Sequence, residues 1–221
     1  MNAVIRQLVL KDLYFSRPVM LGAIVIALIS IPLLSLGSIG RYAAMILMVC
    51  AGAVPSSFIC GALIVGERKE RANLFSLSLP VSGQQMLIAK MLAAAAAYMI
   101  PWIVLLVGAV LVFSASHAPM GLVPFGIMFW VFLLDEFFIT LAASLSSRAE
   151  GWFTVAVVVC NVSISFYIFS FLTVSSIAKQ LPSVTAVWSP LVFRVLTVEV
   201  LFAVALASLI GWQLSRRTDF I

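Results

Sequence analysis

The chain has 221 residues, of which 64% are hydrophobic and 10% are charged, and its mean hydropathy is +1.21. Soluble domains are about 45–50% apolar and about 25% charged, so this composition excludes a soluble protein and leaves no length for a separate soluble domain. The formal net charge of +5 reflects basic residues on the inner side of a membrane, and nucleic-acid binding is not expected. We therefore expect one all-α polytopic transmembrane domain over residues 1–221.

Residues 1–17 are expected to form an amphipathic helix that lies in the cytosolic interface of the membrane. Apolar residues recur there at helical spacing, and polar residues occupy the other side of the helix. The apolar positions are Val4, Ile5, Leu8, Val9 and Leu13, and the polar ones are Arg6, Gln7, Lys11 and Asp12. Cations on such a helix lie near anionic headgroups. The alternative is an ordinary polar flank before the first span.

Six apolar runs follow, and each is long enough to cross a hydrocarbon core of about 30 Å as a helix. The predicted spans are residues 18–37, 43–66, 86–113, 122–145, 151–174 and 191–214. Because the number of spans is even, both termini lie on the same side. The sequence thus predicts six transmembrane helices.

Residues 67–85, between the second and third spans, form the longest polar interruption. Charged residues end the second span, namely Glu67, Arg68, Lys69, Glu70 and Arg71. Large apolar residues then alternate with small polar ones and are Leu74, Phe75, Leu77 and Leu79. Pro80 ends a helix there, and Ser82 with Gln85 fits a capping box that begins the next one. A short amphipathic helix between two spans is predicted.

Basic residues set the orientation, because loops on the cytosolic side carry an excess of Lys and Arg. Ten of the thirteen basic residues fall on the side that holds the termini and residues 67–85. The other three are Arg41, Lys179 and Arg194. We therefore expect a multi-pass protein of the inner or plasma membrane with both termini in the cytosol. Residues 175–190 then form an amphiphilic connection on the outer side.

Five polar residues within the spans are candidates for lining a conduit. Ionisable groups inside a membrane are costly and indicate either a functional or a paired site. The candidates are Asp135, Glu136, Thr140, Asn161 and Glu199. The structural alternative is that they bond to hydroxyl groups, or to Arg194, and hold the helices together. The residues alone leave both interpretations open.

No constellation of catalytic or metal-binding residues is recognisable in the sequence. One histidine, His117, cannot supply a metalloprotease motif, and Cys50, Cys60 and Cys160 all lie in apolar runs. A phosphate-binding GxxxxGK[ST] motif is also missing from the sequence, so ATP hydrolysis by that route is not expected. We expect no catalytic residue, no metal site and no cofactor bound by this chain.

Two stretches of the sequence resemble ABC-2 type permeases, the membrane subunits of ATP-binding-cassette (ABC) exporters. The first is Leu8-Val9-Leu10-Lys11-Asp12-Leu13, directly before the first span. The second combines Glu67-Arg68-Lys69-Glu70, Leu77-Ser78-Leu79-Pro80-Val81-Ser82 and Ala89-Lys90. The resemblance implies that residues 67–85 form a coupling helix, and that residues 175–190 form a loop or short re-entrant helices.

The same resemblance implies partners for the chain. Two separate ATPase subunits would bind ATP and Mg²⁺ and would contact Glu67–Pro80, while a second permease copy or a paralogue would complete the pathway. The substrate would leave the cytosol by alternating access, and the apolar spans favour an amphiphilic peptide, drug or lipid-like molecule. A proton- or ion-coupled secondary transporter that uses Asp135 or Glu136, or a membrane scaffold, is the alternative. An enzyme is the least favoured class.

Overall fold

The computed structural model describes residues 3–33, 36–66, 83–115, 120–146 and 150–216. Throughout these ranges the regular structure is helical, and no strand occurs in them. The elements are α1 (Ala3–Leu33), α2 (Gly37–Cys60), the π-helix η1 (Gly61–Gly66), α5 (Gly83–Ala115), α6 (Leu122–Ser146), α7 (Glu150–Thr173), α8 (Ser175–Ala178) and α9 (Pro190–Arg216). Six of these helices are long and apolar enough to cross a membrane. The predicted all-α, six-span fold is confirmed.

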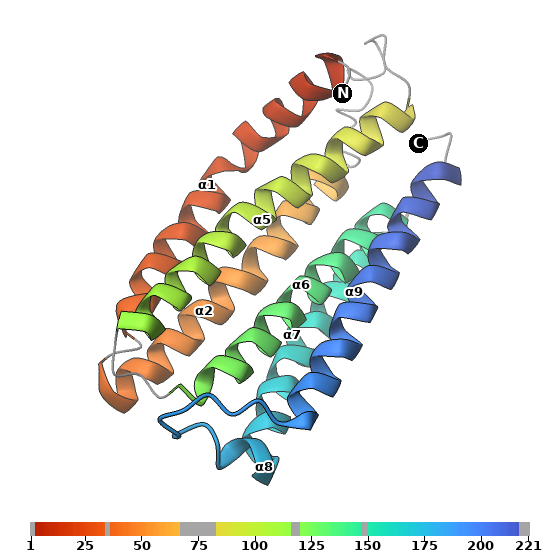
Figure 1. Cartoon of the computed structure of the whole chain (residues 1–221). Helices are drawn as coiled ribbons and strands as arrows, with labels where there is room; N and C mark the ends of the chain where they lie inside the picture. Colours follow the sequence, from red (N-terminus) through yellow and green to blue (C-terminus); the bar gives the residue numbers. More distant parts are fainter. Residues whose placement is uncertain (1–2, 34–35, 67–82, 116–119, 147–149, 217–221) are drawn as a thin grey trace.

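The long helices form one bundle of two three-helix groups (Figure 1). In the first group α1 packs along α5 and α2, and in the second α6 packs along α9 and α7. Contacts between α2 and α6 join the groups. In Figure 1, α1 begins and α9 ends at the same end of the bundle, and α8 lies at the opposite end. We refer to the end that carries α8 as the α8 end.

The start of the chain differs from the expected separate helix over residues 1–17. Within the described residues, α1 is continuous from Ala3 to Leu33 and runs through Pro18. Its polar side is not directed to headgroups throughout, because Asp12 and Ser16 are only 2% and 4% exposed. They are buried because α1 packs along α5. Packing between two helices therefore takes precedence over the amphipathic pattern of this segment.

Small residues allow α1 and α5 to approach closely, as in other membrane helix pairs. Ala93, Ala94 and Ala97 on α5 are fully buried and belong to a core cluster that Val9 and Leu13 of α1 pack against. Five consecutive alanines, residues 93–97, favour such a contact, but nothing in the sequence identifies the partner helix. Lipid tails are as apolar as leucine, so shape rather than hydrophobicity determines the neighbours.

The centre of the bundle is filled by side chains from several helices. The Tyr98 and Phe137 rings stack with their centroids 4.2 Å apart, and the Tyr98 hydroxyl donates a hydrogen bond of 2.9 Å to the carbonyl of Leu133. Both rings are at most 1% exposed. They link α5 to α6 and fill the space between these helices.

At the α8 end, the connection before α9 folds back onto the start of α6. The amide of Gly121 donates to the carbonyl of Ser183 over 3.1 Å. A β-carbon at Gly121 would collide with the carbonyl oxygen of Gln180, so glycine permits this close approach. Residues 175–190 thus combine the four-residue helix α8 with turns, and their re-entry into a membrane stays a prediction.

Candidate functional site

Most of the coupling segment predicted at residues 67–85, namely residues 67–82, lies outside the described residues. This range includes every predicted ATPase contact, namely Glu67, Arg68, Lys69, Glu70, Arg71, Leu74, Phe75, Leu77, Leu79 and Pro80. The structure does describe the elements on either side of it. The π-helix η1 ends at Gly66 before the segment, and α5 begins at Gly83 after it. Single π-turns within α-helices are frequent at functional sites.

A buried ion pair joins α1 to the first turns of α5. The ammonium nitrogen of Lys90 lies 3.3 Å from the Oδ2 atom of Asp12, and the two side chains are only 3% and 4% exposed. Lys90 is seven residues after Gly83, about 10 Å along α5 at 1.5 Å per residue. The pair therefore lies close to where the chain leaves the predicted coupling segment.

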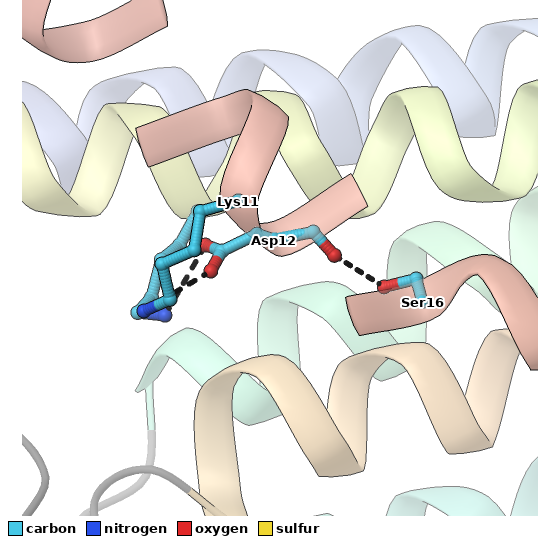
Figure 2. A network of polar contacts seen from close by, with 4 residues as sticks. Lys11, Asp12 and Ser16 are labelled. Carbon is cyan, nitrogen blue, oxygen red and sulfur yellow. Dashed lines mark hydrogen bonds and ion pairs between the residues drawn. The ribbon is translucent and has the colours of Figure 1, made fainter. Parts of the chain in front are cut away.

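Two further polar groups surround Asp12 (Figure 2). Ser16 donates a hydrogen bond of 2.9 Å to the backbone carbonyl of Asp12. Lys11 approaches the Oδ1 atom of Asp12 at 3.6 Å, and its side chain is 59% exposed. The buried pair makes the stronger connection, because water and salt screen the exposed one. The helical pattern predicted Asp12 only as part of the polar side of the first helix. Its partner could not be predicted, because a pairing across 78 positions leaves no local pattern.

Glu136 and Thr140 lie in the packed centre of the protomer. Their side chains are 3% and 0% exposed, and the Thr140 hydroxyl donates to the Glu136 carbonyl at 3.0 Å. Cys60 approaches the Thr140 oxygen at 4.0 Å. The Oε1 atom of Glu136 is buried and has no hydrogen-bond partner among the described residues. A carboxyl group in this position avoids a large desolvation cost by binding a proton or a cation.

Glu199 lies in a second place, where α6, α7 and α9 meet. The Tyr167 hydroxyl on α7 donates a hydrogen bond of 2.5 Å to Glu199 on α9. The Tyr167 ring stacks on Phe132, with centroids 4.1 Å apart. One oxygen each of Asp135 and Glu199 has no partner within the described part of the chain.

Tyr167, rather than Arg194, is the described partner of Glu199. Arg194 is exposed on α9, as expected for a basic side chain that extends toward the interface. In the sequence, Tyr167 is one of several polar residues within the predicted span at residues 151–174. A tyrosine and a glutamate on different spans give no spacing signal, so only the packing of α7 and α9 reveals the pair.

The fifth candidate, Asn161, is exposed on α7 and apart from both carboxyl sites. Its side-chain amide donates to the carbonyl of Val157 at 2.8 Å. Four of the five conduit candidates are therefore buried, three on α6 and one on α9, whereas Asn161 lies on the outer face of α7.

The described residues also hold no group of three or more histidine, cysteine or carboxylate side chains suited to a metal ion. The sequence model described as "ABC-2 family transporter protein" matches residues 7–215. Neither the curated proteins nor the solved structures contain a significant match.

Proposed function

The chain belongs to the ABC-2 family of transporter proteins, and from this premise we propose that it is the permease subunit of an ABC exporter. In this proposal two permeases pair with two separate ATPase subunits, which bind ATP and Mg²⁺. Residues 67–85 contact the ATPase, and its closure on ATP moves the permeases from inward to outward access. The termini and residues 67–85 are cytosolic, in the inner or plasma membrane.

The buried Asp12–Lys90 pair is the observation that carries the coupling part of the proposal. It ties α5, the helix that follows residues 67–82, to α1 close to their shared end. A push on the coupling segment therefore moves α1 and α5 together rather than bending α5 alone. The extensive contact between these helices supports the same conclusion.

The closed interior supports the proposal that the pathway lies between two permeases. Tyr98 and Phe137 fill the centre of the described protomer. The exposed face of α7 carries Asn161 and Ser165 beside Val158 and Phe166. Polar side chains on membrane helices usually bond across helix contacts, so this mixed face suits a second permease better than lipid. A pathway between two such faces would suit an amphiphilic peptide, drug or lipid-like substrate.

The test is co-purification of the ATPase with a tagged permease from its native host. Replacing Leu74 and Phe75 together by aspartate should abolish the association, because apolar anchors of an interface would become charged. The matched control replaces Ser76 and Ser78 by aspartate, which adds the same charge at polar positions of the same segment. ATPase bound equally by both double variants would show that these apolar residues are not the principal contact.

A second function, a proton- or ion-coupled carrier, is favoured by one observation. Asp135, Glu136 and Glu199 each keep a buried oxygen without a described partner, as a group that takes up and releases a proton would. The isolated chain in vesicles would then move substrate on a pH gradient without ATP. ATP-independent flux that disappears in Asp135→Asn or Glu136→Gln would establish this function and displace the exporter.

A further inference from the structure

A cavity of about 480 Å³ opens between the two helix groups at the α8 end of the bundle. Its walls come from the first turns of α2 and α6 and the last turns of α5 and α7. Leu181 and Pro182, from the connection before α9, border it as well. This volume falls within the range of roughly 300–1,000 Å³ typical of sites for small molecules.

The lining of this cavity is hydrocarbon almost throughout. No charged side chain contributes to it, and Met45, Met48, Ala109, Gly126 and Trp130 are among its residues. The indole N–H of Trp130 points elsewhere, since it donates to the carbonyl of Trp102 at 3.4 Å. Nothing in the lining can orient a charged ligand. A peptide segment is also disfavoured, because its backbone groups would find no hydrogen-bond partners.

The depth of the cavity identifies the occupant. On α6 the lining extends from Leu122, the first residue of the helix, to Trp130. This distance is roughly 12 Å at 1.5 Å per residue. One leaflet of a hydrocarbon core is roughly 15 Å deep, half of the full thickness. Tyr42 lies at the mouth and is 69% exposed, as tyrosines at a membrane interface often are.

We infer that this cavity holds one acyl chain of a membrane phospholipid from the leaflet at the α8 end. That leaflet is the outer one in the predicted orientation. The acyl chain fills the space between α2 and α5 on one side and α6 and α7 on the other. The lipid therefore contacts both helix groups. The inference requires no ATPase and no particular substrate, and it can be tested on the permease alone.

The experiment uses phospholipids with bromine on the acyl chain, which quench the fluorescence of a tryptophan that they touch. One variant keeps only Trp130 and another keeps only Trp102, with phenylalanine at the remaining tryptophan positions, namely Trp152, Trp188, Trp212 and the other member of the pair. Each indole donates to the carbonyl of the other residue, at 3.3 and 3.4 Å, so the two lie at similar depth.

Of these two tryptophans, only Trp130 lines the cavity. Trp130 is nevertheless just 6% exposed, and Trp102 is more exposed. A lipid chain inside the cavity therefore quenches Trp130 more than Trp102. Bromine far along the chain should quench Trp130 more than bromine next to the headgroup. If only surrounding lipid touches the protein, the more exposed Trp102 is quenched at least as strongly as Trp130, and the inference is wrong.

Filling the cavity supplies the second arm. A β-carbon at Gly126 meets no atom within 4 Å, so Gly126→Phe places a ring in the cavity without a collision of its β-carbon. The quenching of Trp130 should be lost in this variant. The matched control is Gly22→Phe, because Gly22 is exposed on α1, has the same free space and does not line the cavity. Equal quenching in both variants would overturn the assignment.

Discussion

The Asp12–Lys90 pair makes a prediction with a calculable size. In Lys90→Met the side chain keeps most of its length but loses its charge, so Asp12 stays buried at 4% exposure with only the exposed ammonium of Lys11 nearby. Removing one partner of a buried pair costs about 3–5 kcal/mol. We expect the free energy of unfolding, measured by SDS titration of the protein in mild detergent, to fall by about that amount.

Two controls separate the buried pair from its exposed neighbour. Lys11→Met removes an ammonium group that lies 3.6 Å from Asp12 on a side chain that is 59% exposed. We expect it to lower the free energy of unfolding by only about 0–1 kcal/mol. The double variant Asp12→Leu with Lys90→Met exchanges both charges for apolar groups. Because such exchanges are often neutral or stabilising, by about 1–4 kcal/mol, we expect it to recover the stability that Lys90→Met loses.

The same variants can also show that the Asp12–Lys90 pair contributes little. A loss below about 1 kcal/mol in Lys90→Met would mean that the pair behaves like a solvated surface contact. Equal losses in the single and double variants would show that Lys90 acts through other contacts. The coupling role also predicts that the double variant, although stable, transmits ATP hydrolysis to transport poorly. Normal transport by the double variant would limit the pair to a structural role.

Two further substitutions test the packing of the bundle in the same unfolding assay. Tyr167→Phe leaves Glu199 without the hydrogen bond at 2.5 Å and should cost about 1–3 kcal/mol; an unchanged stability would show that this contact is absent. A β-carbon at Gly52 would lie 2.5 Å from the Leu133 side chain, so Gly52→Val should cost about 1–3 kcal/mol through overpacking. The control Gly211→Ala meets open space and should be neutral or stabilising by up to about 1 kcal/mol; similar effects at both glycines would contradict the close α2–α6 contact.

The spans could be predicted from the sequence because a membrane demands long apolar helices with internally satisfied backbones. The predicted run at residues 122–145 and the helix α6 (Leu122–Ser146) differ by one residue. The third span was predicted shorter than α5 (Gly83–Ala115), because polar flanking residues continue a helix beyond the apolar run. Element lengths are thus local properties that a pattern can reveal.

Neighbours are not local properties, and the sequence could not supply them. Asp12 and Lys90 are 78 positions apart, and Tyr167 and Glu199 are 32 apart. Each pair forms because two uniformly apolar helices pack in one particular rotation, which hydrophobicity does not encode.

The mass of the intact complex tests the central claim most directly. The tagged permease would be purified from its native host in mild detergent and weighed by native mass spectrometry. We expect a complex of two permeases with two ABC ATPase subunits, and we expect the Leu74→Asp, Phe75→Asp variant to lose the ATPase subunits. A permease that is free of any ATPase, reproducibly and after gentle crosslinking, would contradict the account and favour a gradient-driven carrier.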